Sequence, residues 1–289
     1  MIGKKDATSI YKLAPLKPFT YDPGILSKSE VEINVEYCGI CHSDVSMIEN
    51  AWGMAQFPVV PGHEITGTIH NIGTDVTRFK IGDKVGLGWH SGYCNHCDSC
   101  EQGDLNLCVN PQPTIVGHFG GFADKVRADE HSVIRIPDGM DLQMIGPLFC
   151  GGITVFNPLC QFNIKPTDYV GVIGIGGLGH LALKFLNAWG CEVTAFTSST
   201  EKLKEAKLFG AHHTICSTDT NALEQVSGKF DFIISTVNVP LDWNLYISAL
   251  KPKGRLHIVG GVLEPLDVGA FGLIMGQRQI SGSPVGSPY

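Results

Sequence analysis

The chain has 289 residues, of which 43% are hydrophobic and 17% charged, and its formal net charge is −7 at pH 7. This composition is that of a compact globular protein with room for two domains. The negative charge excludes a broad basic surface for a nucleic-acid backbone. The first twenty residues have no apolar core, and no apolar run is long enough to cross a bilayer. We therefore expect a cytoplasmic protein with a small-molecule substrate and no nucleic-acid or membrane partner.

The first half of the chain, from about Glu30 to Pro137, consists of short β-prone runs separated by glycines. Runs of this spacing are typical of a small β-barrel or sandwich. After Met140 longer apolar stretches alternate with helical patterns, as expected where repeated strand–helix units begin. We therefore expect two domains, residues 1–145 and residues 146–289. The β-prone runs of the first domain are residues 31–37, 65–73, 83–89, 120–128 and 132–137.

The second half contains six strand candidates with helical patterns between them, which predicts an α/β domain with a doubly wound parallel sheet. The sequence stops on the last candidate, and we interpret this as an early stop that omits a C-terminal segment. If Tyr289 ends the natural chain, we expect uncovered apolar surface on both domains and reduced stability. A melting temperature like that of a full-length relative would refute this expectation. The candidates are residues 169–175, 192–198, 212–217, 230–237, 255–261 and 279–286.

Four of the ten cysteines follow the spacing C-x2-C-x2-C-x7-C. In a reducing compartment cysteines are expected as thiols or metal ligands rather than as disulfides. A bacterial iron–sulfur run begins with the same spacing, but its last interval is three residues followed by proline, whereas here it is seven followed by Val109. Four thiolates on one short loop can close a tetrahedron around a structural zinc ion. The predicted ligands are Cys94, Cys97, Cys100 and Cys108.

A second set of soft ligands comes from three separated segments, which contribute Cys41, His63 and Cys150. Two thiolates and one imidazole leave one position open, as in a catalytic zinc site. Taken alone, a cysteine is usually a small buried apolar group and a histidine is usually a hydrogen-bonded core residue. Their occurrence together with the four-cysteine run and a glycine loop favours a metal site.

The glycine loop has the pattern G-x-G-x-x-G at Gly174, Gly176 and Gly179, after an apolar strand and before a helical pattern. In that context we interpret it as a dinucleotide-binding loop, although a glycine-rich packing turn gives the same letters. The second strand ends in Thr197, Ser198 and Ser199, with Lys202 one turn later. Because no carboxylate is present there to repel a 2′-phosphate, we predict NADP. The alternative is that these residues only cap the next helix.

The motifs GICHSD, PGHE, the four-cysteine run, CGGIT and GIGGLG occur in this order. Over essentially the whole chain they resemble the zinc-dependent medium-chain alcohol dehydrogenases, in particular the cinnamyl alcohol dehydrogenase-like branch. The resemblance implies a GroES-like β-barrel catalytic domain followed by a Rossmann NADP-binding domain. It also implies two Zn²⁺ ions per chain, NADP(H) as cofactor and a homodimer.

For the catalytic domain the resemblance implies that Ser43 hydrogen-bonds the substrate oxygen and that Asp44 orients His63. It also implies that Glu64 lies behind the metal and assists ligand exchange. The alternatives are that Ser43 or Asp44 caps the helix that follows and that Glu64 is an ordinary structural carboxylate. Many relatives have a histidine where this chain has Ser46. How the proton relay continues beyond Ser43 is therefore left open.

The resemblance also implies further cofactor contacts, and aromatic residues near the metal suggest a substrate pocket. Trp52 and Trp89 are candidates for its walls, with core packing as the alternative. We expect reversible reduction of aromatic or medium-sized aldehydes to primary alcohols. The alternatives are an NAD-dependent polyol or formaldehyde dehydrogenase, or a zinc- and nucleotide-binding protein without turnover. The implied cofactor contacts are His42, Thr154, Gly177, Leu178, Thr236, Val237, Gly260, Gly261, Ser283 and Val285.

Overall fold

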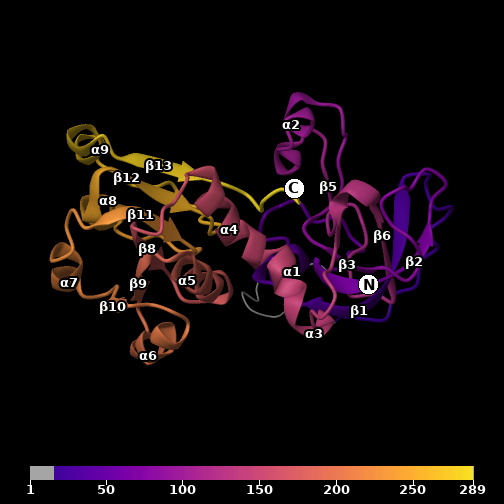
Figure 1. Cartoon of the computed structure of the whole chain (residues 1–289), viewed down its shortest axis with the longest axis horizontal. Coiled ribbons are helices and arrows are strands. Elements are labelled where there is room, and N and C mark those ends of the chain that lie inside the picture. The colour runs from indigo at the N-terminus through magenta and orange to yellow at the C-terminus, as the bar shows by residue number, and fades with distance from the viewer. Residues whose placement is uncertain (1–15, 289) are drawn as a thin grey trace. The chain divides into compact units, whose positions relative to one another are not determined.

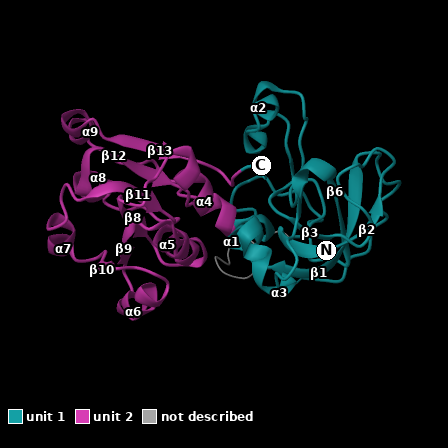
Figure 2. Cartoon of the chain, in the orientation of Figure 1, with its two compact units in different colours: residues 1–150, 287–289 teal, residues 151–286 magenta. Residues whose placement is uncertain are grey.

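The computed structural model describes residues 16–288, which form two compact units (Figure 1, Figure 2). Unit 1 extends to Cys150 and also includes residues 287–288, and unit 2 covers Gly151–Gly286. The boundary that we predicted near residue 145 falls at the end of α3 (Leu142–Ile145). The division after Cys150 keeps this cysteine in the same unit as Cys41 and His63.

Unit 1 is built around an antiparallel sheet in the order β6-β1-β2-β3-β7. Alternating apolar residues form its core, because successive side chains of a strand point to opposite faces; Val31, Ile33, Ile65 and Ile69 are almost fully buried. Each of the five predicted β-prone runs overlaps one of these strands. They are β1 (Glu30–Gly39), β2 (Glu64–Ile72), β3 (Lys84–Leu87), β6 (Lys125–Asp129) and β7 (Val133–Arg135).

Loops and short elements of unit 1 carry the candidate metal ligands. Cys41 immediately precedes α1 (His42–Ile48). The four-cysteine run includes α2 (Asp98–Glu101) and the 3₁₀ turn Leu105–Leu107. A two-stranded ribbon flanks this run, formed by β4 (His90–Gly92) and β5 (Gln112–Pro113). The other 3₁₀ turns are Glu130–Ser132 and Gly146–Phe149.

Cys150 lies at a break in a helical segment. The pieces Leu142–Phe149 and Gly151–Gln161 meet at an angle of 53°, and the second piece is α4 (Gly151–Gln161). Within residues 16–288 no single helix has the length and hydropathy to cross a membrane. Among these residues, only this bent pair reaches such a length and hydropathy when its two pieces are taken together. Inside α4, Pro158 has no backbone N–H to donate.

Unit 2 is a six-stranded parallel sheet in the order β10-β9-β8-β11-β12-β13, with helices on both faces (Figure 1). This confirms the predicted doubly wound sheet. The strand order reverses between β8 and β11, where sheets of this type bind ligands at the carboxyl ends of their strands. The strands are β8 (Tyr169–Ile173), β9 (Glu192–Thr197), β10 (His213–Cys216), β11 (Phe230–Ser235), β12 (Leu250–Ile258) and β13 (Gln279–Gly282).

Buried apolar side chains hold a helical layer against each face of this sheet. Val170 and Val172 face the layer that contains α4 and α5, whereas Ile173 and Ile233 face the layer that contains α8. Because both faces are covered, the strands read as nearly continuous apolar runs rather than as alternating ones. The helices after α4 are α5 (Gly177–Trp189), α6 (Thr200–Leu208), α7 (Thr220–Glu224), α8 (Trp243–Ala249) and α9 (Ala270–Gly276).

Candidate metal and dinucleotide sites

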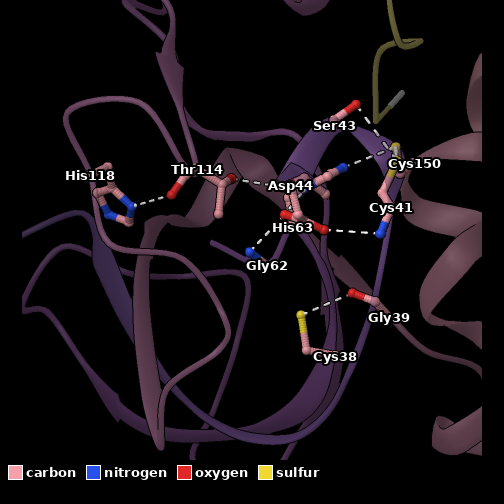
Figure 3. A network of polar contacts seen from close by, with 11 residues as sticks. Cys38, Gly39, Cys41, Ser43, Asp44, Gly62, His63, Thr114, His118 and Cys150 are labelled. Atoms are coloured by element: carbon pink, nitrogen blue, oxygen red, sulfur yellow. Dashed lines mark hydrogen bonds and ion pairs between the residues drawn. The ribbon is translucent and has the colours of Figure 1, made fainter. Parts of the chain in front are cut away.

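The structure brings Cys41, His63 and Cys150 together (Figure 3). Glu64 lies beside them. One ligand atom from each of the four lies within 4.8 Å of the others. The two Sγ atoms are 3.9 Å apart, and Nε2 of His63 is 3.2 Å from Sγ of Cys150. Two thiolates bound at about 2.3 Å to a tetrahedral zinc ion are themselves about 3.8 Å apart. The spacing and the donor atoms therefore fit zinc.

Asp44 connects this cluster to the start of α1. Its Oδ1 is 3.0 Å from Nδ1 of His63 and accepts a hydrogen bond from N of Gly62 at 2.8 Å. Its Oδ2 accepts from N of Cys41 at 2.9 Å. An ionised carboxylate only accepts, so Nδ1 of His63 donates and Nε2 is directed toward the thiols. Asp44 thus combines the two alternatives considered for it, because it caps the helix and orients the imidazole.

Burial and mutual hydrogen bonds shift the pKa values of the four side chains in this cluster. The adjacent Cys150 thiol and the His63 ring lower the pKa of Cys41 to about 4, against the effect of burial. Burial opposes charge on His63, but hydrogen bonds to Asp44 and Cys41 outweigh it and raise its pKa to about 9. Burial and the charge of Cys41 raise the pKa of Glu64 to about 7. The hydrogen bond to Cys41 and burial raise the pKa of Cys150. Without a metal the cluster thus favours one thiolate beside a protonated imidazole, and a divalent cation would take the place of the protons that these groups share.

Two more residues of unit 1 border the cluster, and a third contacts one of them. Oγ of Ser43 is 3.6 Å from Sγ of Cys41. The Trp89 ring meets the His63 ring edge-on, with 5.1 Å between centroids and an interplanar angle of 88°. Trp52 in turn contacts Trp89 at 6.1 Å. A hydroxyl and an aromatic surface therefore lie next to the candidate ligands.

The four-cysteine run forms a second cluster, whose ligand atoms also lie within 4.8 Å of one another. Sγ of Cys94 and Sγ of Cys100 are 3.9 Å apart, again close to the edge of a zinc tetrahedron. The backbone amides of Cys94 and Asn110 donate to Sγ of Cys108 at 3.3 and 3.4 Å, which favours a thiolate there. Asn95 adopts a left-handed conformation with φ 59° inside the run. Four thiols leave no ligand position for a substrate.

The glycine loop between β8 and α5 has three distinct environments. Gly174 has φ +85°, and a side chain there would collide with Val237. A side chain at Gly179 would collide with the Gly174 carbonyl, so this glycine allows α5 to pack against the turn. Around Gly176 and Gly177 no atom would come within 4 Å of an added Cβ. This open backbone at a helix N-terminus fits a pyrophosphate.

The end of β9 presents the predicted hydroxyl groups. Thr197 is buried and its Oγ1 accepts a hydrogen bond from N of Ser199 at 3.3 Å. Ser199 is the N-cap of α6, where its Oγ accepts from N of Lys202 at 3.4 Å. Ser198 and the Lys202 side chain are exposed. The capping alternative thus holds for Ser199, while Ser198 and Lys202 remain accessible to a ligand.

The other predicted cofactor residues occupy different environments. Oγ1 of Thr236 donates to the carbonyls of Ile173 and Gly174, which ties the glycine loop to β11. Oγ of Ser283 lies 3.0 Å from Nε2 of His257. In unit 1 His42 is exposed, and in unit 2 Thr154 is buried on α4. Gly260 packs closely against Val237, Gly261 has open space around it, and Leu178 and Val285 are half-buried.

Our sequence interpretation missed two residues that organise the site. One is Thr114, which lies in a loop and is fully buried behind Trp89. The other is Gly62, which donates its amide to Asp44. No spacing pattern marks the role of either residue, because Gly62 acts through its backbone amide and Thr114 through hydrogen bonds to backbone carbonyls. Only the PGHE motif, in which Gly62 precedes His63, gave an indirect signal.

Comparison with known proteins matches both units to one enzyme family. Residues 27–138 match the model of an alcohol dehydrogenase GroES-like domain, and residues 177–289 match that of a zinc-binding dehydrogenase. The aldehyde reductase AdhA of Synechocystis is 61% identical over 273 residues, which cover 94% of this chain and 81% of that protein.

Solved structures give the same result. A cinnamyl alcohol dehydrogenase from Sorghum bicolor has a TM-score of 0.91 at 36% identity, over 95% of this chain and 81% of its own. A cinnamyl alcohol dehydrogenase from Helicobacter pylori, solved in complex with NADP(H), has a TM-score of 0.84 at 32% identity, over 91% and 78%. The chain therefore belongs to the zinc-dependent medium-chain alcohol dehydrogenases, a family of oxidoreductases, in their cinnamyl alcohol dehydrogenase-like branch.

Proposed function

We propose that the protein reduces aromatic or medium-sized aldehydes to primary alcohols with NADP(H), reversibly, and that each chain holds two zinc ions. The observation that carries this proposal is the cluster of Cys41, His63 and Cys150, whose donor atoms are spaced for a tetrahedral zinc ion. The aldehyde reductase AdhA, at 61% identity, supports the reaction class.

In this proposal Cys41, His63 and Cys150 hold the catalytic zinc, and the four-cysteine run holds the structural zinc. Bound zinc supplies a Lewis acid that stabilises negative charge on the substrate oxygen. Asp44 keeps the His63 ring in place through the contact between Oδ1 and Nδ1. Glu64 lies within ligand distance of the same centre and is placed to exchange with a departing ligand.

Ser43 is proposed to deliver the proton. Its Oγ lies next to Sγ of Cys41, and a hydroxyl can accept and donate a proton at the same atom. Ser46, at the position where many relatives have a histidine, is buried in α1. We therefore propose that the proton reaches Ser43 through water or a cofactor hydroxyl rather than through a side chain at position 46.

The cofactor is proposed to bind unit 2 at the glycine loop, where it would supply the hydride. The open backbone at Gly176 and Gly177 receives the pyrophosphate. Ser198 and Lys202 provide an exposed hydroxyl and an ammonium group for the 2′-phosphate. The Helicobacter pylori structure, which contains NADP(H), supports this choice over NAD. A cytoplasmic location and a homodimer remain proposals by analogy with the family.

The first experiment compares NADPH with NADH in the reduction of cinnamaldehyde by the purified protein. Faster consumption of NADPH supports the proposal, and preference for NADH with a polyol or formaldehyde substrate supports the alternative enzyme. A folded protein that binds one zinc ion and consumes neither cofactor points to nucleotide binding without turnover. Total zinc measured on the same sample separates these cases.

The phosphate site is tested by Ser198→Asp. A carboxylate at this position repels the 2′-phosphate, so we expect the KM for NADPH to rise about 10-fold or more while the KM for NADH changes little. Asn221→Asp is the matched control, because it adds the same charge to an exposed position in unit 2 at α7. An equal change in both KM values, or the same change in the control, would refute the assignment.

A further inference from the structure

The backbone of Trp89 is held by one buried residue, Thr114. N of Thr114 donates to the carbonyl of Trp89 at 2.7 Å. Its Oγ1 donates to the carbonyl of Gly88, also at 2.7 Å. Thr114 is fully buried and directly follows β5. Two consecutive carbonyls, one on each side of the Trp89 Cα, are thus fixed by a single residue.

Neighbouring groups leave Thr114 and Gly88 little freedom. Nδ1 of His118 lies 3.0 Å from the carbonyl of Thr114, and it must donate because a carbonyl only accepts (Figure 3). The backbone of Gly88 packs so closely against the carbonyl of Phe149 that an added Cβ would collide with it. The segment between β3 and β4, which carries Trp89, is therefore held on two sides.

The Trp89 ring is the part of this segment that reaches the candidate metal site. It meets the His63 ring edge-on at 5.1 Å and contacts Trp52 at 6.1 Å, and part of its surface is exposed. A shift of the backbone at residues 88–89 moves the indole relative to the metal centre. The position of this aromatic surface therefore depends on the hydrogen bond from Oγ1 of Thr114 to the carbonyl of Gly88.

We infer that Thr114 is a positioning residue for substrate specificity, which fixes Trp89 as the wall that receives an aromatic aldehyde. This inference rests on the proposed function, because it assigns Trp89 to the substrate pocket. The Trp89 ring would contact the aromatic ring of the substrate equally in the ground state and in the transition state of hydride transfer. Its displacement should therefore raise KM and leave kcat nearly unchanged.

The test replaces Thr114 by Val, which keeps the shape and removes the hydroxyl donor. We expect the KM for cinnamaldehyde to rise about tenfold, with kcat and the KM for acetaldehyde within about twofold of the wild type. Thr114→Ser restores the donor and should restore the KM. In a Trp89→Ala background, Thr114→Val should have no further effect on the ratio of the two KM values.

Thr66→Val is the matched control. Thr66 is also fully buried in unit 1, and its Oγ1 donates to the carbonyl of Leu142 at 2.8 Å rather than to the carbonyl of Gly88 or Trp89. Thr66→Val should lower the melting temperature to a similar extent without changing the KM ratio. The inference is overturned if Thr66→Val changes that ratio equally, if Thr114→Ser does not rescue, or if Thr114→Val still acts without Trp89.

A second readout does not depend on turnover. The adjacent indoles of Trp52 and Trp89 should contribute to the near-ultraviolet circular dichroism spectrum. The difference between the spectra of the wild type and of Trp89→Ala gives the signal of this pair. Thr114→Val should change the circular dichroism signal of this pair, whereas Thr114→Ser and Thr66→Val should leave it unchanged. If Thr114→Val does not fold, Thr114→Ala is measured in its place. A wild-type protein that reduces no aldehyde refutes the proposed function, and an unchanged spectrum refutes the role of Thr114.

Discussion

The two cysteine clusters offer similar ligand atoms at similar distances, yet they are assembled differently. The four-cysteine run takes all its ligands from residues 94–108, within one loop. The cluster of Cys41, His63 and Cys150 collects its ligands from three segments, up to 109 residues apart. In both clusters one Sγ–Sγ distance is 3.9 Å.

Their surroundings differ more than their ligands. The four-cysteine run receives backbone amide donors at Cys108, and its four thiols would fill all four positions of a tetrahedral zinc ion. The other cluster has Asp44 behind the imidazole, Ser43 beside a thiol and Trp89 against the ring. A local loop is sufficient to close a metal site. An open site needs several elements, because the position left for substrate must be bordered by groups from elsewhere in the chain.

The largest difference between the clusters should appear when Cys150 is changed. Cys150→Ala leaves two strong ligands for the proposed catalytic zinc, so we expect activity to fall at least about 10³-fold with little loss of melting temperature. Metal analysis should show the loss of one zinc ion per chain. Cys160→Ala is the control, because Cys160 is an exposed thiol on α4. Retention of full activity by Cys150→Ala would remove the distinction between the clusters.

The converse change affects the closed cluster. Cys108→Ala removes a buried ligand whose metal binding is coupled to folding of the loop, so we expect a loss of about 3 kcal/mol or more in unfolding free energy. Thermal unfolding with and without added zinc measures this effect. Cys216→Ala, on β10 of unit 2, is the matched cysteine control. If Cys108→Ala abolished activity without lowering stability, the four-cysteine run would have a catalytic role.

A smaller effect is expected from Asp44→Asn, which tests the group behind the imidazole. The neutral amide polarises His63 less, so zinc affinity at the open cluster should fall about 10- to 100-fold while the four-cysteine run keeps its metal. Competition with a chromogenic chelator measures both sites. Asp129→Asn is matched, because Asp129 also caps a helical turn and contacts a histidine, His131. Equal zinc loss in this control would contradict the assignment.

The sequence predicted where the strands lie along the chain more completely than the register in which they pair. All six strand candidates of the second half became neighbours in one parallel sheet, because apolar runs that alternate with helical patterns have few other solutions. The strand predicted at residues 255–261 instead runs from Leu250 to Ile258. Its pairing with β11 contains an irregularity, and Lys253 adopts a positive φ. Local propensity does not reveal such a register shift.

The amino-acid sequence by itself determined the four-cysteine run, the glycine loop and the order of the strands, since their chemistry depends on neighbours close in the chain. The joint occurrence of the motifs also grouped Cys41, His63 and Cys150 as one metal site. Only the tertiary structure decided that Asp44 accepts a hydrogen bond from the amide of Gly62 and that Thr114 holds the backbone of Trp89. These contacts join residues far apart in sequence through backbone carbonyls and amides. Every residue carries such groups, so no pattern of side chains records which of them will pair.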